Sequence, residues 1–241
     1  MARGRPRLLP QGDTAFTIEF GETIDADLNA AVLALDARLA EAGLAGIVET
    51  VPTYRSLTVH IDPVAADPEK LGQAVLALAR SNLKRPRAGR LWRIPVVYGG
   101  AFGIDLGAVA AHHGLDPAVL IERHSAPEYR VAMLGFLPGY AYLSGLDPSL
   151  ALSRRPTPRP MTAAGTISIG GAQALVASIA APSGWHLLGR TPVRSFVPGR
   201  DPVFLFEPGD AVRFVPTEAK RWPALERAAE AGDLVAECSG G

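Results

Sequence analysis

Glycine and proline divide the second half of this chain into short apolar runs. Runs this short are typical of β-strands, because glycine and proline supply the tight turns between them. The predicted strands cover residues 128–134, 166–169, 174–179, 186–188, 203–206 and 211–215, and two predicted short helices at 105–113 and 116–124 precede them. Strands that are so short and so closely spaced predict a closed barrel or a sandwich.

The first part of the chain alternates strand and helix patterns. The predicted strands cover 14–20, 47–51 and 57–61, and the predicted helices cover 26–42, capped by Asp25, and a run that begins at Pro68. Capping aspartates and a proline in the first helical turn are typical helix starts. A strand at 91–98 would complete a ferredoxin-like α/β unit. Alternatively, that strand opens the second domain.

The segment 82–90 is polar and basic and contains proline and glycine, which is typical of a linker. We therefore predict an N-terminal α/β domain over 1–85, the end of a linker at 86–90, a barrel domain over 91–217 and a helical tail over 218–241. The fold class that follows is α+β.

Composition argues against several classes of function. The 24 Lys and Arg residues balance the 24 Asp and Glu residues, whereas a general nucleic-acid binder usually has a basic excess. No apolar run is long enough to cross a membrane, so no membrane partner is expected. Cys238 is the single cysteine, which excludes an intrachain disulfide and suggests a reducing cytoplasm. None of the five histidines has a zinc-binding spacing, so no metal is predicted.

The aromatic run 135–143 is interrupted by a proline and a glycine, which an ordinary strand would not contain. One interpretation is a tight turn that presents backbone amides and aromatic side chains to a cavity. The other is a β-turn between two barrel strands. The candidate substrate-binding residues in this run are Phe136, Pro138, Gly139, Tyr140 and Tyr142.

The segment 153–162 contains three arginines among three prolines and forms a stiff basic loop. Arginine binds carboxylate or phosphate groups through two parallel hydrogen bonds. The loop, which includes Arg159, is therefore a candidate anion-binding segment, although an ordinary surface loop has the same composition.

Four further residues are candidates for the same site. Gly165 allows close approach of the backbone to a ligand, or a β-bulge, and Gln173 offers both a donor and an acceptor. Trp185 either stacks on a ligand or fills the barrel end. Arg190 follows Gly189 in a glycine turn and is a candidate for anion binding.

His124 is a candidate acid, base or anchoring group, because it precedes Ser125 at the end of a predicted helix. Neighbouring residues rarely have the geometry of a nucleophile and its base, and the chain has no Gly-x-Ser-x-Gly elbow.

Several of these segments match a known family in order and spacing. They are Tyr98-Gly99-Gly100, Asp105-Leu106, His124-Ser125, Gly135-Phe136-x-Pro138-Gly139-Tyr140-x-Tyr142-Leu143, Pro158-Arg159, Gln173 and Gly184-Trp185-x-Leu187-x-Gly189-Arg190-Thr191-Pro192. The set resembles the kinase-A-inhibitor family, which is also described as allophanate hydrolase subunit 1 and as the B subunit of bacterial 5-oxoprolinase. The chain departs from the family pattern at Ala101, where a glutamate is usual, at Ile104, where a proline is usual, and at 174–178, where the usual stretch contains a tyrosine.

The resemblance implies a ferredoxin-like N-terminal domain followed by a cyclophilin-like β-barrel. It implies an ATP-dependent hydrolase complex that opens 5-oxo-L-proline to L-glutamate, in which the partners are a C subunit (similar to allophanate hydrolase subunit 2) and an A subunit. ATP would bind to this chain or to a partner, and the isolated chain would be inactive. Other members imply two alternatives, inhibition of a sensor histidine kinase and a urea- or allophanate-type carboxyltransferase or hydrolase component.

In the enzyme interpretation, Arg159 and Arg190 bind an anionic group, whereas His124 and Gln173 orient the substrate or a proton. Backbone amides near Gly139 and Gly165 polarise the amide oxygen. Together with Trp185 and the aromatic run, these residues predict a pocket at the barrel end for a small anionic amide.

Overall fold

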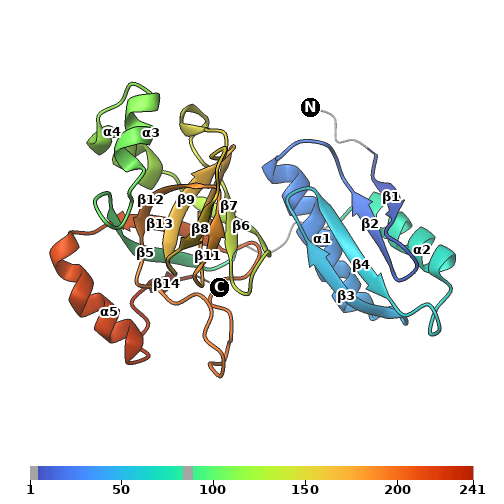
Figure 1. Ribbon diagram of the computed structural model, residues 1–241. Coiled ribbons are helices and arrows are strands. Elements are labelled where there is room, and N and C mark those ends of the chain that lie inside the picture. The colour runs from blue at the N-terminus through green and yellow to red at the C-terminus, as the bar shows by residue number, and fades with distance from the viewer. Residues whose placement is uncertain (1–4, 84–88, 241) are drawn as a thin grey trace. The chain divides into compact units, whose positions relative to one another are not determined.

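The computed structural model describes residues 5–83 and 89–240 of the chain, which divides into two compact units, 1–87 and 88–241 (Figure 1). Residues 86–88 of the predicted linker lie outside the described residues. The first unit contains β1 (Arg7–Pro10), β2 (Ala15–Glu19), α1 (Ala26–Ala42), β3 (Ile47–Pro52), β4 (Ser56–Ile61) and α2 (Pro68–Arg80).

The second unit contains a larger set of elements. They are β5 (Leu91–Tyr98), α3 (Leu106–His112), α4 (Pro117–Ser125), β6 (Tyr129–Leu134), β7 (Ala141–Ser144), η1 (Pro148–Leu150), β8 (Arg159–Thr162), β9 (Thr166–Gly170), β10 (Gln173–Val176), β11 (Ala181–Ser183), β12 (His186–Arg190), β13 (Ala211–Pro216), η2 (Ala219–Arg221), α5 (Trp222–Glu230) and β14 (Glu237–Ser239).

The first unit is an antiparallel sheet in the order β1-β2-β4-β3 with two helices packed on it (Figure 1). Successive side chains on a strand point to opposite faces, and alternate residues such as Ile18, Leu57 and Val59 are fully buried. They share one core with Val32 of α1 and Val75 of α2. This α/β sandwich confirms the predicted class of the N-terminal unit.

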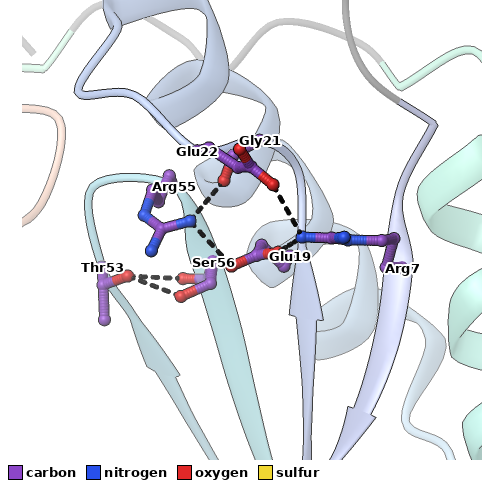
Figure 2. A network of polar contacts seen from close by, with 7 residues as sticks. All are labelled: Arg7, Glu19, Gly21, Glu22, Thr53, Arg55 and Ser56. Carbon is purple, nitrogen blue, oxygen red and sulfur yellow. Dashed lines mark hydrogen bonds and ion pairs between the residues drawn. The ribbon is translucent and has the colours of Figure 1, made fainter.

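The fourth strand of this sheet is β1, and β5 belongs to the second unit. The possibility that the strand at 91–98 closes the first unit is therefore wrong. Figure 2 shows a polar network that holds β1 in place. Arg7 Nη2 lies 2.5 Å from Glu19 Oε1, and Arg55 Nη1 lies 2.7 Å from Glu19 Oε2. The hydrogen bond from Arg7 is the main cause that lowers the pKa of Glu19, and the charge of Arg55 adds to it.

The second unit is a closed β-barrel. Seven strands follow the order β12-β9-β10-β7-β6-β13-β5, and β12 pairs with the end of β5 to close the ring. Fully buried side chains, including Ile94, Val131, Ile167 and Leu188, fill the barrel interior. α3 and α4 pack together at one end of the barrel (Figure 1). The α+β class with a closed barrel is confirmed.

Two predicted elements of the second unit are wrong. Residues 203–206 form only an isolated bridge between Phe204 and Phe196. In the tail predicted as helix over 218–241, α5 ends at Glu230 and the chain returns as β14 along β5. Gly232 ends the helical run, because its φ of 97° lies in a region that glycine adopts without strain. No helix among the described residues is long and apolar enough to span a membrane.

Candidate functional site

A pocket of about 230 Å³ lies on the outer face of the barrel. It is lined by Phe136, Tyr140, Tyr142, Arg154, Arg155, Pro158, Leu175, Pro182, Ser183, Gly184 and Trp185. The aromatic run, the arginine loop and the Gly-Trp turn, which are distant in sequence, therefore meet at one place. Among the predicted residues, the pocket brings together Phe136, Tyr140, Tyr142 and Trp185.

The pleat of β10 explains why the pocket lies outside the barrel. Ala174 and Val176 point into the barrel core, whereas Leu175 between them joins a second apolar cluster around Trp185. The barrel interior is filled with side chains, and this pocket lies outside it. The predicted ligand site at the barrel end stays a prediction, and four of its aromatic residues meet at the side pocket.

The aromatic wall of the pocket is built from edge-to-face pairs. Tyr142 and Trp185 have ring centroids 5.8 Å apart, and Phe136 and Tyr140 have centroids 5.7 Å apart. The Tyr140 hydroxyl donates a hydrogen bond of 2.9 Å to the Ile179 carbonyl. Burial raises the pKa of Tyr140 to about 12 and also raises the pKa of Tyr142, although the charge of Arg154 opposes the second shift. Both hydroxyls are therefore protonated donors at neutral pH.

Phe136 is the most unusual residue of the wall. Its φ is 67°, a region that non-glycine residues rarely adopt, and 69% of its surface is exposed. Such a conformation persists where the surrounding structure imposes it, and it is concentrated at functional sites. On its other side, Phe136 borders a hollow of about 310 Å³ that Pro138 and Gly139 line. Pro138 and Gly139 thus support the turn and face this second hollow.

Two arginines that sequence reasoning did not single out form the polar edge of the pocket. The Arg154 guanidinium carbon lies 5.3 Å from the ring centroid of Trp185, in a cation–π arrangement. Arg155 lines the same pocket, and its backbone N–H donates to the Gly184 carbonyl at 2.8 Å. The basic composition of the loop was the available signal, but spacing did not indicate which of its arginines face the cavity.

Arg159 does not line the pocket. Its Nη2 atom lies 2.6 Å from Asp105 Oδ1, and the other Asp105 oxygen accepts a 2.8 Å hydrogen bond from the Leu187 N–H. Arg155 Nη1 also approaches Asp105, at 3.6 Å. The charge of Arg159 is therefore already paired, which argues against its predicted direct contact with a substrate.

Three other candidates lie apart from the pocket. A Cβ on Gly165 would come within 2.1 Å of the Thr191 carbonyl oxygen, so this glycine permits strand packing. Arg190 stacks over Trp222 at 4.9 Å, and its Nε donates to the Ala164 carbonyl. Gln173 pairs with Gly170 on β9 and does not line the pocket. It lies two residues before Leu175, which does line the pocket, and on the same outer face of β10.

His124 lies in the core and not at the pocket. It is fully buried, stacks on Phe214 with ring centroids 5.0 Å apart, and forms a 2.9 Å hydrogen bond between its Nδ1 and the Tyr98 hydroxyl. Burial lowers its pKa to about 3, so the ring is neutral at physiological pH. The full burial of the ring argues against the acid or base alternative, whereas the hydrogen bond to Tyr98 fits the anchoring alternative.

The buried His124 predicts a loss of stability in mild acid. The folded state leaves His124 neutral down to a pKa of about 3, whereas the unfolded chain binds a proton near pH 6.5. Unfolding then takes up a proton, so the free energy of unfolding should fall by up to about 1.4 kcal/mol per pH unit below pH 6. Urea titrations between pH 7.5 and 5 measure this slope. His124→Gln should make the free energy of unfolding less dependent on pH, whereas His112→Gln, which changes an exposed histidine, should not. Equal slopes in these two variants and the unchanged protein would show that His124 does not cause the loss of stability.

A further cavity, of about 470 Å³, lies in the first unit and includes Phe20, Ala31, Ala34, Arg5 and Arg80 in its lining. The Arg80 guanidinium already donates to the Pro6 carbonyl. None of the predicted site residues lies there. In the described part of the chain, no group of three or more His, Cys, Asp and Glu side chains is arranged to hold a metal ion.

An α/β unit followed by a closed barrel is the architecture of the two-part carboxyltransferase domains. The chain belongs to the family described as carboxyltransferase domain, subdomain C and D, which matches residues 6–206.

The relatives narrow this class. The B subunit of 5-oxoprolinase from Escherichia coli O157:H7 is 40% identical over 221 residues, which cover 90% of this chain and 97% of the relative. The corresponding protein of Bacillus subtilis (strain 168) is 37% identical over 226 residues, which cover 89% of this chain and 94% of the relative. The resemblance expected from the motifs is thereby confirmed. The solved urea amidolyase of Kluyveromyces lactis shares the fold, with a TM-score of 0.83 and 19% identity over 97% of this chain and 16% of its own.

Proposed function

We propose that this chain is the B subunit of a 5-oxoprolinase-type hydrolase complex, which opens the lactam ring of 5-oxo-L-proline to give L-glutamate. Similarity to two such subunits over nearly their whole length supports the assignment. The structural observation that carries it is the pocket of about 230 Å³, in which an aromatic wall meets two arginines. A small flat ring that bears a carboxylate has the matching size and chemistry.

Each part of the lactam has a partner in this pocket. The ring would lie against Trp185 and Tyr142, because apolar ring faces pack well on aromatic side chains. The carboxylate would bind at Arg154 and Arg155, since guanidinium groups match its geometry. The Tyr142 hydroxyl would donate to the amide oxygen, because the Tyr140 hydroxyl is already bonded to Ile179.

Ring opening also requires activation of the amide. Hydrolysis of an unstrained lactam is slow, so coupling to ATP through an acyl-phosphate-like intermediate is reasonable. The residues of the side pocket do not fit a nucleotide: its polar edge is short, and the sequence lacks the Gly-x-x-x-x-Gly-Lys-Ser/Thr loop that holds phosphates. We therefore place ATP on a partner protein of the complex.

The partners of this chain would be a C subunit, similar to allophanate hydrolase subunit 2, and an A subunit. The naming of the relatives as B subunits supports an assembly of several different chains. The side pocket supplies binding groups but contains no nucleophile–base pair within its lining. The isolated chain is accordingly expected to be inactive, with the remaining catalytic groups on its partners.

The test is reconstitution of the purified chain with its two partner proteins. We expect ADP release and glutamate formation that both depend on added 5-oxo-L-proline. A complete complex that forms but releases no ADP would refute the proposed function.

Removal of one pocket arginine should weaken substrate binding in that complex. Arg154→Ala removes a cation that stacks on Trp185, so KM for 5-oxoproline should rise about tenfold, as expected for the loss of one charge-assisted contact. Arg123→Ala is the matched control, because this exposed arginine of α4 lies outside the pocket lining and donates to Ser149. An unchanged KM in Arg154→Ala would place the carboxylate elsewhere.

A further inference from the structure

Asp105 begins α3 but does not cap it. An aspartate at this position usually accepts hydrogen bonds from the backbone of the first helical turn, which stabilises the helix by about 1 kcal/mol. Asp105 makes no such bond, whereas the corresponding Asp116 at the start of α4 accepts one from Ala118. The carboxylate of Asp105 instead points away from its helix. Its role must be sought in the groups that it contacts there.

Those groups anchor the arginine loop. Asp105 is 6% exposed and accepts hydrogen bonds from the Leu187 N–H of β12 at 2.8 Å and from Arg159 at 2.6 Å. Arg155 Nη1 lies 3.6 Å from the same carboxylate. One buried carboxylate therefore ties the loop to the barrel on both sides of Pro156 and Pro158. Arg154, which stacks over Trp185, is the neighbour of Arg155 in the same loop.

The positive charge of this cluster exceeds its negative charge. One carboxylate faces Arg155 and Arg159, and Arg154 has no acidic partner within the part of the chain that the structure describes. Two buried nitrogen atoms, Nε of Arg155 and Nη1 of Arg159, also have no hydrogen-bond acceptor there, and of these two residues only Arg155 lines the pocket. An unpaired buried donor is costly, and an incoming anion would satisfy it.

We propose that Asp105 is a positioning residue that holds Arg155 and Arg154 at the pocket edge to receive the carboxylate of the substrate. The inference rests on the proposed function in one respect, the identity of the anion. The direction of the change in anion affinity after removal of Asp105 distinguishes positioning from simple charge compensation. If Asp105 only neutralised the arginines, its removal would leave a more positive pocket and strengthen anion binding; if it positions them, its removal weakens anion binding.

The kinetic experiment uses the reconstituted complex. Asp105→Asn keeps the size of the side chain and an acceptor for Leu187 but removes the charge. We expect KM for 5-oxoproline to rise about tenfold, with a smaller change in kcat. Asp116→Asn, which changes only a helix cap, should leave KM within about twofold. A KM that is unchanged or lower in Asp105→Asn overturns the proposal.

A second variant guards against misfolding of Asp105→Asn. Arg155→Ala removes the positioned group itself and should raise KM to a similar extent. The double variant should be no worse than either single variant, because both changes act through one contact. An unchanged KM in Arg155→Ala, or fully additive effects, overturns the proposal.

A third readout does not depend on the substrate. The Nε–H signals of Arg154, Arg155 and Arg159 can be followed by NMR in the full chain, with arginine-to-lysine variants for assignment. Asp105→Asn should shift the signals of Arg155 and Arg159 and accelerate their exchange with water, whereas Asp116→Asn should not. If the Arg155 and Arg159 signals are unchanged in Asp105→Asn, the positioning role is overturned, even if the reconstituted complex hydrolyses 5-oxoproline. Shifted signals in a complex that does not turn over 5-oxoproline refute the proposed function and uphold the positioning role.

Discussion

Gly165→Ala is expected to destabilise the barrel by about 3–5 kcal/mol, as the sum of two costs. The φ of Gly165 is 74°, which costs a non-glycine residue about 1–2 kcal/mol. In addition, a Cβ there would lie 2.1 Å from the Thr191 carbonyl oxygen, and backbone cannot move aside as a flexible side chain can. The Thr191 N–H also donates to the Gly165 carbonyl, so any shift disturbs a pairing between loops.

Gly171 provides a matched control for this prediction. Its φ of 62° imposes a similar backbone cost, but a Cβ there would meet no atom within 4 Å. Gly171→Ala should therefore cost only about 1–2 kcal/mol. Urea titrations followed by tryptophan fluorescence measure both, because Trp92, Trp185 and Trp222 all lie in the barrel unit. Equal losses in the two variants would show that the approach to Thr191 does not determine the stability.

Asp210→Ala is expected to cost a similar amount, about 3–5 kcal/mol, because it removes a buried carboxylate that accepts hydrogen bonds from several donors at once. Asp210 is 2% exposed and accepts hydrogen bonds from Arg90 Nη2 at 2.8 Å, from the Trp92 indole N–H at 2.9 Å and from the Glu207 N–H at 3.0 Å. These contacts fix the start of β5 beside β13. Without the carboxylate, the buried indole N–H loses its acceptor, whereas the Arg90 guanidinium keeps only the Leu205 carbonyl and the exposed Glu207.

The control for Asp210 is Glu207→Ala. Glu207 also lies near Arg90, at 3.2 Å, but its side chain is mostly exposed, so its ion pair should contribute less than about 1 kcal/mol. Thermal unfolding and urea titration of the full chain distinguish the two variants. A small effect of Asp210→Ala would mean that water replaces the carboxylate at this position.

The sequence patterns predicted the barrel better than the details of its edges. Short strands separated by glycine and proline are a local signal, which indicated a closed barrel or a sandwich, and the structure shows the barrel. β1 was missed because a four-residue strand that ends at Pro10 has too few residues to show a period. β14 was assigned to a helix because its strand conformation comes from pairing with β5, a partner about 145 residues earlier in the chain.

The candidate site was predicted where the signal was local and missed where it was tertiary. Tyr140, Tyr142 and Trp185 were identified because glycine turns and aromatic residues stand together in the sequence. Arg159 was predicted to contact the substrate, but in the structure it pairs with Asp105, which lies 54 residues before it, and Arg154 and Arg155 line the pocket instead. Spacing along the chain carries no information about which guanidinium such a distant carboxylate will bind.

The separation of the filled barrel interior from the pocket on its outer face has a consequence for how this protein can evolve. The pocket residues Phe136, Arg154 and Arg155 belong to surface loops, so substitutions there leave the packed interior untouched. New ligand preferences can therefore arise by drift in two loops without a penalty in folding. A saturation library restricted to these loops should yield mostly folded variants, which makes the scaffold suitable for directed evolution toward other small ligands.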